Sequence, residues 1–292
     1  MRAVRRTAHG PVARLGLALW CAFALCSAPT IAQDRLPIVD AHVHYSRDAW
    51  PLFPPDLALD ILDAAGVPRA LVSSTPDDGT LMLERADPDR VVPFLRPYRS
   101  SGELGSWYDD PTVLAYLEER LASGAYRGIG EFHLSDESSA ATPVMRRIVA
   151  LALERDIMLH VHSGAAPIRA LLALEPRLEL LWAHAGMSEP PEVVGALLDR
   201  HDRLWTELSF RASDVAPGGA LDPAWHELLV RHRDRFMIGS DTYLASRWGE
   251  YGHLIDAHRA WLAQLPREVA LAIAYKNAVR LFGAGGRREL QD

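Results

Sequence analysis

Histidine and acidic side chains gather at the ends of short apolar runs in this sequence, often two residues apart. They are His42, His44, Glu131, His133, His160, His162, His184 and Asp241. Because residues i and i+2 of a β-strand project to the same face, pairs such as His42 and His44 point the same way. Imidazoles and carboxylates that converge suit a divalent metal ion such as Zn²⁺. The first chemistry that the sequence predicts is therefore metal binding.

The apolar runs are strand candidates, and they alternate with helical patterns along the chain. Eight strands are predicted at 37–44, 69–75, 91–98, 127–133, 157–162, 178–184, 204–210 and 235–241. Helices are predicted at 56–65, 80–86, 111–123, 143–155, 167–174, 191–200, 223–233, 251–264 and 267–282. Several of these helices begin with proline in the first turn, where its missing N–H is tolerated.

This alternation predicts an α/β fold with a parallel sheet. Eight strand–helix units in about 250 residues fit a (β/α)₈ TIM barrel. An open doubly wound sheet is the alternative, but no G-x-G-x-x-G motif follows a strand. The barrel is favoured because five strand ends carry ligand-type residues, and these ends meet at the mouth where barrel enzymes have their active sites. Buried charge there would be costly without a bound partner.

Four further residues are predicted to surround this site. His133 and His160 are assigned to an outer layer, because ligating imidazoles need hydrogen-bond partners of their own. Arg96 and Arg211 follow strands and could clamp a substrate carboxylate or phosphate with the planar fork of the guanidinium. A structural ion pair is the alternative for either arginine, in a chain that contains thirty of them.

The first 32 residues have the layout of a secretory signal peptide. They contain four arginines, no acidic residue and an apolar run over 15–26 that is too short to span a bilayer comfortably. We expect cleavage after Ala32, so that residues 33–292 form a single domain in the periplasm or outside the cell. An uncleaved membrane anchor is the alternative.

Removal of this segment would change the composition of the working protein. Both cysteines, Cys21 and Cys26, lie in it, so the mature chain would have no disulfide and no cysteine ligand. The net charge would fall from −7 to −11, because 27 basic residues would then face 38 acidic ones. Such a charge disfavours nucleic-acid partners, and no stable membrane span is expected after cleavage. The expected partner is a small-molecule substrate, and a homo-oligomer is left open.

Several motifs resemble those of the amidohydrolase superfamily, in its amidohydrolase-related (type 2) branch. They are Gly128-Ile129-Gly130-Glu131, Trp182-Ala183-His184-Ala185-Gly186, Ile238-Gly239-Ser240-Asp241 and Lys276-Asn277-Ala278-Val279-Arg280-Leu281-Phe282. The pair His42-x-His44 fits the same pattern, and the resemblance spans about residues 36 to 283. It implies a metal-dependent barrel enzyme.

The resemblance also implies six metal ligands, which are His42, His44, Glu131, His162, His184 and Asp241. The first pair and Asp241 would hold one ion, and the other two histidines a second ion, with Glu131 as the bridge. Many members use a carboxylated lysine as the bridge, but the single lysine of this chain, Lys276, lies in the terminal helix. His162 is preferred to His160, because it precedes a short polar turn and lies nearer the mouth. Zinc is the expected metal, as one or two ions, with manganese as the alternative.

The implied reaction is hydrolysis by a metal-activated water. A bound ion lowers the pKa of its water to about 7, and Asp241 would accept the proton and pass it to the leaving group. With one ion only, His184 would be free to act as an electrophile or an acid–base group. The sequence therefore predicts an exported metal-dependent hydrolase that acts on an ester, lactone, amide or phosphoester of a small molecule.

Three alternative functions stay open at this point. A mononuclear-metal decarboxylase of the same branch would bind one ion and release CO₂ without hydrolysis. A secreted TatD-like nuclease would need a basic groove, which the acidic charge disfavours. A non-enzymatic barrel that senses or sequesters ions would bind metal without turnover.

Overall fold

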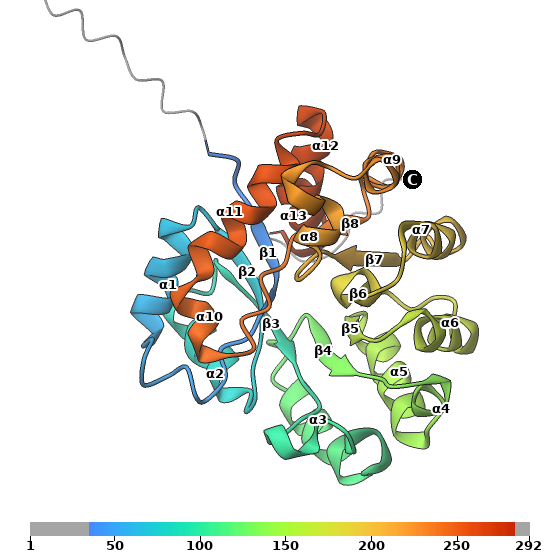
Figure 1. The fold of residues 1–292 in the computed structure, drawn as a ribbon. Helices are drawn as coiled ribbons and strands as arrows, with labels where there is room; N and C mark the ends of the chain where they lie inside the picture. The colour runs from blue at the N-terminus through green and yellow to red at the C-terminus, as the bar shows by residue number, and fades with distance from the viewer. Residues whose placement is uncertain (1–34, 284–292) are drawn as a thin grey trace, which may run out of the picture. The chain divides into compact units, whose positions relative to one another are not determined.

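A computed structural model describes residues 35–283, which form a barrel of eight parallel strands (Figure 1). The strands follow one another around the barrel in sequence order: β1 Val39–Val43, β2 Arg69–Ser73, β3 Val91–Leu95, β4 Gly128–His133, β5 Met158–His162, β6 Leu180–Trp182, β7 Leu204–Glu207 and β8 Phe236–Met237. Helices cover the outside, because parallel neighbours need crossover connections. The predicted (β/α)₈ TIM barrel is confirmed, and the open sheet is excluded.

The helices are α1 Pro55–Ala64, α2 Asp78–Ala86, α3 Thr112–Leu121, α4 Glu137–Ala140, α5 Pro143–Arg155, α6 Ala165–Leu174, α7 Pro191–Arg200, α8 Ala212–Val215, α9 Pro223–Arg231, α10 Ala245–Gly249, α11 Tyr251–Leu262, α12 Arg267–Leu271 and α13 Asn277–Phe282. Some begin with proline behind a side-chain cap. At the start of α5 the Thr142 hydroxyl accepts the Met145 amide, and Asp222 caps α9 in the same manner. The observed bounds of α5 and α7 are the predicted ones, and the other predicted helices differ by a few residues.

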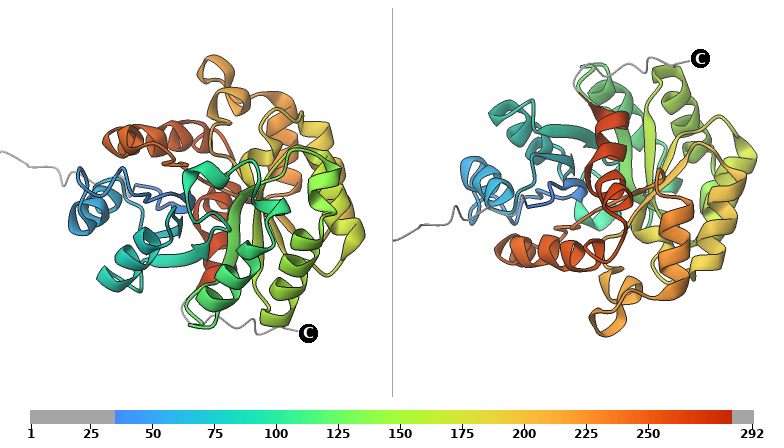
Figure 2. Two further views of the ribbon diagram at one scale, coloured as in Figure 1. Left: turned by 90° about the horizontal axis from the view of Figure 1, so that it is seen from below. Right: turned by 90° about the horizontal axis from the view of Figure 1, so that it is seen from above.

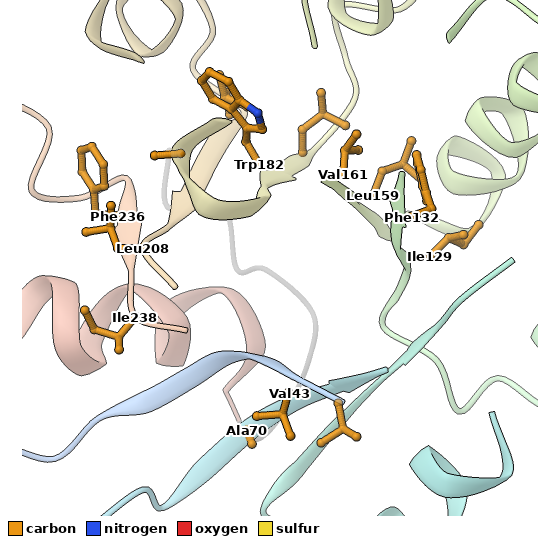
Figure 3. Packing of buried hydrophobic residues seen from close by; sticks show 14 of the residues in the cluster. Val43, Ala70, Ile129, Phe132, Leu159, Val161, Trp182, Leu208, Phe236 and Ile238 are labelled. Atoms are coloured by element: carbon orange, nitrogen blue, oxygen red, sulfur yellow. The ribbon is translucent and has the colours of Figure 1, made fainter. Parts of the chain in front are cut away.

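Buried apolar side chains form two layers, one inside the barrel and one between the barrel and the helices. Inside, Val39 and Phe94 cluster with Phe282 of α13, and the rings of Phe94 and Phe282 lie 5.8 Å apart. The terminal helices, red in Figure 2, run alongside the strands, and α13 brings Phe282 to apolar residues at the end at which the strands begin. Outside, residues such as Phe132 and Trp182 pack toward the helices (Figure 3). The open end of the barrel is therefore the one that carries the carboxyl ends of the strands.

Hydrogen bonds between β1 and the end of β8 close the barrel. Asp40 and Ile238 form an isolated parallel bridge, and the Ala41 amide donates to the Ile238 carbonyl at 2.7 Å. Further along, the Asp241 amide donates to the His42 carbonyl at 2.7 Å. The closure therefore places Asp241 beside His42, although the two residues lie in the first and last strand–helix units.

Six strands end one to four residues earlier than predicted, namely β1, β2, β3, β6, β7 and β8. The backbone explains the early ends of β6 and β8. β6 stops at Trp182, because His184 and Ala185 have φ angles of 57° and 45°, in the left-handed region. β8 has only two residues, because the chain beyond Met237 turns to bond with β1, and Asp241 has a φ of 50°. A residue with a β-carbon loses about 1–2 kcal/mol in this conformation. Both turns direct the polar residues that follow the strands toward the barrel mouth. Backbone strain of this kind is typical of functional sites.

The last predicted helix, 267–282, is not continuous. A π-helical segment, Ala272–Lys276, separates α12 from α13. Asn277, which belongs to one of the motifs, donates to the carbonyls of Arg233 and Phe236 at 2.7 and 2.8 Å. It thereby ties α13 to the start of β8.

Some predictions concern residues that the structure does not describe. The predicted signal peptide, with cleavage after Ala32, lies outside the described residues, and export stays a prediction. Within residues 35–283, the helices are all too short or too polar to cross a membrane.

A buried histidine of α11 makes the stability of this barrel depend on pH. His258 is 3% exposed, its Nδ1 accepts the Trp261 indole N–H at 3.3 Å, and burial lowers its pKa from 6.5 to about 4. As the pH falls through this window the unfolded chain binds the proton first, so the stability present above pH 6.5 is progressively lost. Glutamine does not titrate in this range. We therefore expect the free energy of unfolding of His258→Gln to fall by about 3 kcal/mol less than that of the wild type when the pH is lowered through this window. Urea unfolding of both metal-free proteins at the two ends of the window measures this difference, and equal losses would contradict it.

Candidate metal centre

Two histidines and two carboxylates converge where β1 ends. His42 Nε2 lies 3.0 Å from His44 Nε2, so the two rings project together. Glu131 Oε2, from β4, lies 3.4 and 3.1 Å from these two nitrogens, and Asp241 Oδ1 lies 3.7 and 3.3 Å from them. All four side chains are buried. We call His42, His44 and Asp241 the first ligand group.

His162 and His184 lie on the other side of Glu131, and we call them the second ligand group. His162 Nδ1 is 2.8 Å from Glu131 Oε1. His184 Nε2 is 3.1 Å from His162 Nδ1 and 3.6 Å from the same carboxylate oxygen. The two oxygens of Glu131 therefore face different groups, Oε2 the first and Oε1 the second. The structure brings together all six residues that the sequence indicates as ligands.

Two glycines allow the backbone to approach closely enough for this arrangement. Gly130 has a φ of 130°, and a β-carbon there would lie 2.2 Å from the His160 carbonyl oxygen. A β-carbon on Gly239 would lie 2.1 Å from Glu207 Oε2. Any side chain at either position would force strands apart directly beside the ligand groups.

The hydrogen bonds around the first ligand group show that it fits a cation. The His42 Nδ1 atom bonds to the Glu207 carboxylate at 3.0 Å, and the His44 Nδ1 atom to the Ser73 carbonyl at 2.7 Å. Both partners only accept, so each neutral ring has its proton on Nδ1 and presents the lone pair of Nε2 to the other. Asp241 Oδ1, beside these lone pairs, has no hydrogen-bond partner among the described residues. Nitrogen and carboxylate donors that face one another in this way suit a divalent metal ion.

The charges in the centre lead to the same conclusion. Burial opposes the charged form of His42, but the carboxylates of Asp241, Glu131 and Glu207 outweigh this effect and raise the pKa of His42. Burial also opposes ionisation of Asp241, but His42 and His44 hold its pKa at about 2. The carboxylates are therefore ionised, and the centre stabilises positive charge of the kind that a divalent ion supplies.

A cavity of about 940 Å³ opens over the two ligand groups. Glu131, His162, His184 and Asp241 all line it, so a molecule in the cavity can reach both groups. Pockets of this size commonly bind small organic ligands.

A family model described as amidohydrolase matches residues 39–284, which is nearly the whole barrel. The chain belongs to the amidohydrolase family. The resemblance seen in the sequence motifs is thereby confirmed, and with it an enzyme of the amidohydrolase superfamily.

Solved structures share the amidohydrolase barrel at low sequence identity. A probable 2-pyrone-4,6-dicarboxylic acid hydrolase from Acinetobacter baumannii, with citric acid bound, is 13% identical with a TM-score of 0.57, over 85% of this chain and 99% of that one. An apo protein from Agrobacterium tumefaciens is 16% identical with a TM-score of 0.53, over 89% of this chain and 100% of that one. At these identities the likeness shows the fold alone. No curated protein matches the chain.

The amidohydrolase centre also depends on a carboxylate that the sequence analysis missed. Glu207, at the end of β7, is fully buried and accepts hydrogen bonds from His42 Nδ1 and from the amides of His184 and Ser209, the latter two at 2.7 Å. Burial opposes its ionisation, but His42 and His184 hold its pKa well below the ordinary value. The signal that could have revealed it is an acidic residue in the middle of the apolar run 204–210.

Asp40, in β1, is a second residue that the sequence did not reveal, and it positions the backbone of the first ligand group. Its Oδ1 atom accepts the amides of His42 and Ser240, both at 3.0 Å, and its Oδ2 atom accepts the Tyr251 hydroxyl at 2.7 Å. Burial raises its pKa to about 6. Because Ser240 precedes Asp241, one carboxylate sets the backbone beside two of the ligands.

We expect Glu207→Gln to weaken the binding of zinc by about 10–100-fold, the usual cost of losing an outer partner of a ligating histidine. The amide has one acceptor oxygen, so it cannot accept from His42 Nδ1 and the His184 amide at one atom and from the Ser209 amide at the other, as the carboxylate does. It also removes the negative charge beside the His42 ring. Competition with a zinc chelator measures the affinity, and Glu189→Gln is the matched control. Glu189 also accepts a backbone amide, that of Ala165 at 2.7 Å, but contacts no imidazole of the centre. Equal zinc affinities in the wild type and Glu207→Gln would overturn the expectation.

His133 and Arg96 lie at the wall of the pocket. The His133 ring stacks on that of His162, with 4.1 Å between centroids, and its Nδ1 bonds to the Tyr98 hydroxyl at 2.9 Å. Arg96 Nη2 lies 3.3 Å from Glu131 Oε2. Both residues line the cavity, so both can contact a substrate.

His160 and Arg211 have structural surroundings. The buried His160 ring packs against that of His42, with 4.6 Å between centroids, on the inside of the barrel. Arg211 donates to the carbonyls of His184 and Glu189, at 3.1 and 2.9 Å. Its guanidinium therefore holds the turn after β6. Arg211 also pairs with Asp214 at 2.7 Å and does not line the cavity, which agrees with the structural ion pair given as the alternative. The substrate clamp stays a prediction.

Proposed function

We propose that this chain is an exported amidohydrolase that binds two divalent metal ions, zinc in the first place, and hydrolyses an ester or lactone bond of a small molecule. The observation that carries the proposal is the position of Glu131. Its two oxygens face two separate ligand groups, at 3.1 Å from His44 Nε2 and 2.8 Å from His162 Nδ1. A carboxylate in that place can bridge two ions.

The donor set supports zinc. The first ligand group and Glu131 Oε2 would hold one ion, and the second ligand group and Glu131 Oε1 the other. Imidazole nitrogens and carboxylate oxygens are common zinc ligands, and no thiolate is needed. When bound, such ions lower the pKa of a water to about 7 and polarise a carbonyl oxygen.

The other parts of the reaction fall to side chains of the chain itself. The ionised Asp241 would accept the proton of the attacking water and then deliver it to the leaving oxygen. Glu207 and Asp40 would hold the imidazoles and the backbone in place while this happens. Arg96 and His133, on the pocket wall, would donate hydrogen bonds to other polar groups of the substrate.

Among acyl compounds, an oxygen ester is favoured by analogy with a solved structure. The Acinetobacter protein is named a probable hydrolase of a 2-pyrone, which is a cyclic ester, and its structure holds citric acid. Proteins that share one fold act on bonds of several kinds. Amides and phosphoesters therefore belong in the test.

The proposal is tested on the purified protein after zinc loading and removal of free metal. We expect about two equivalents of zinc by elemental mass spectrometry, because each ligand group together with one Glu131 oxygen would hold one ion. We also expect hydrolysis of phenyl esters or simple lactones, and loss of this activity with a chelator. About one equivalent with CO₂ release from aromatic acids would indicate a decarboxylase, and cleavage of DNA a nuclease. Bound metal with no turnover on esters, lactones, amides or phosphoesters would indicate a non-enzymatic barrel.

Export is tested separately. Cleavage after Ala32 would leave Gln33 as the first residue of the mature protein. Sequencing the amino terminus of protein recovered from the periplasm or the medium checks this. Protein that stays in the cytoplasm and keeps Met1 would overturn it.

A further inference from the structure

Three large apolar side chains stand half-exposed at the mouth of the barrel, one after each of β6, β7 and β8. They are Met187, Phe210 and Tyr243, with exposures of 41%, 42% and 51%, and we call them the apolar rim. All three line the cavity over the metal centre. Single exposed apolar residues need no explanation, but a set that lines one pocket mouth is typical of ligand binding.

The rim is held in place by its surroundings. The Phe210 ring lies 5.8 Å from the His184 ring and 6.0 Å from the Tyr243 ring, between centroids. The guanidinium of Arg247 lies 4.2 Å from the Phe210 centroid, and the same group donates to the Asp241 and Ser240 carbonyls, both at 2.7 Å. The rim is therefore connected directly to residues of both ligand groups.

Two of the three rim residues have a strained backbone. Met187 and Phe210 have φ angles of 60° and 62°, in the left-handed region. A residue with a β-carbon loses stability there, and leaving an apolar side chain in water adds a further cost. Neither cost is offset by burial within the described chain, since both side chains are about two-fifths exposed. Contact with an apolar group of a ligand would offset the second cost.

The wall of the cavity opposite the apolar rim is mainly polar. Arg96 and Tyr98 follow β3, and His133 ends β4. In an eight-stranded barrel these strands lie across the mouth from β7 and β8, as Figure 1 shows. Among the described lining residues, the apolar ones away from the rim are Pro76 after β2 and Leu104 in the loop after β3, and the Tyr98 ring is buried. The metal centre lies between a polar wall and an apolar one.

We propose that the apolar rim binds an alkyl or aryl substituent of the substrate, so that the preferred substrates are esters or lactones with a hydrophobic side chain. This inference rests on the proposed function and names the substrate class of the same site. In the reaction, the ring C–O bond of a lactone breaks and water supplies the new acyl oxygen. The product is a hydroxy acid, with release of one proton near neutral pH.

The test uses γ-lactones that differ only in the length of an alkyl side chain, from methyl to hexyl, with the zinc-loaded full-length protein. A fully buried methylene is worth about fourfold, and the half-exposed rim should give about twofold for each, or about thirtyfold over the series, in kcat/KM. Proton release follows the reaction. Phe210→Ala and Tyr243→Ala should lower kcat/KM for the hexyl lactone about tenfold and for the methyl lactone less than about twofold.

Two variants serve as controls. Phe210→Leu keeps an apolar side chain on the same backbone and should keep most of the chain-length dependence. Leu52→Ala removes an apolar side chain that is 62% exposed but lies away from the cavity, and it should leave the whole series unchanged. A wild-type kcat/KM that is independent of chain length, or a dependence that survives in Phe210→Ala and Tyr243→Ala, would overturn the inference and leave the proposed function standing.

A binding measurement covers the case in which no lactone is hydrolysed. Titration calorimetry with the alkanoate anions from butanoate to octanoate tests the rim without turnover. Binding that tightens with chain length in the wild type and not in Phe210→Ala would support the rim even if the proposed hydrolysis fails. Binding that is independent of chain length would overturn the inference, whatever the activity.

Discussion

Asparagine in place of Asp241 is expected to lower kcat for the hydrolysis of an ester or lactone by about 10²–10⁴-fold, the usual contribution of a positioned acid–base group. Asp241 is buried at 6% exposure, and its carboxylate lies between His44 Nε2, at 3.3 Å, and His184 Nε2, at 3.8 Å. Its pKa of about 2 keeps it charged and able to accept a proton, which it then holds only briefly before the leaving group takes it. The amide of asparagine cannot accept a proton at all.

The same substitution should leave the zinc content unchanged, because the amide oxygen of asparagine can still ligate an ion. Asp48→Asn is the matched control, since Asp48 lines the same cavity but contacts the Ala245 amide at 3.4 Å, away from the ligand groups. Its kcat should change less than about threefold, as is usual for a group outside the chemistry. Steady-state kinetics and elemental mass spectrometry on both variants decide the matter. Full zinc occupancy with more than a tenth of the wild-type kcat in Asp241→Asn would remove Asp241 from the proton transfer.

The sequence was sufficient for the fold and for the ligand-type residues because both depend on local periodicity. The i, i+2 spacing of His42 and His44 predicts that they share a face, and their Nε2 atoms do meet at 3.0 Å. The strand–helix alternation predicts the barrel, and the barrel brings Glu131 and Asp241 to the same mouth. Each of these inferences needs only the strand period and the rule that parallel strands end on one side.

The outer partners could not be predicted in this way, because they depend on register between distant strands. Glu207 reads as one polar residue in an apolar run, and only the pairing of β7 with its neighbours places it under His42 and His184. For Arg211 the sequence leaves a substrate clamp and a structural ion pair open, and only the structure shows that the left-handed turn after β6 exposes a carbonyl to which it donates. The early end of β8 has the same origin, since closure against β1 is a tertiary effect that overrides strand propensity.

The charges of the centre link the ligand-type residues to their outer partners. Glu131, Glu207 and Asp241 are three buried carboxylates within reach of His42 and His184. Buried carboxylates without compensating positive charge would destabilise the barrel. The left-handed conformations of His184 and Asp241 add to that cost. A metal ion bound in the folded state and not in the unfolded one would offset these terms, so zinc should raise the stability of the barrel as well as support catalysis.

Glutamine in place of Glu131 is expected to reduce the zinc content from about two equivalents to about one, because an amide offers one oxygen ligand where a bridging carboxylate offers two. The remaining ion should occupy the first ligand group, which keeps three donors in His42, His44 and Asp241. The second ligand group keeps only His162 and His184. The kcat for hydrolysis should fall by at least about 100-fold. Both ions would act on the same substrate, so the ion that stays could not replace the one that is lost.

A control separates the bridge from a general loss of charge or folding. Glu118→Gln removes a carboxylate that is 46% exposed and pairs with Arg147 at 2.8 Å, on the outside of the barrel, and it should keep both ions. His162→Asn removes a ligand of the second group only, and should also leave about one equivalent of zinc. If Glu131→Gln keeps two ions while His162→Asn keeps one, the second ion does not need the bridge. If the wild type itself holds one ion, Glu131 is a ligand of the first group alone, and His184 becomes free for the acid–base role that a single-metal centre would give it.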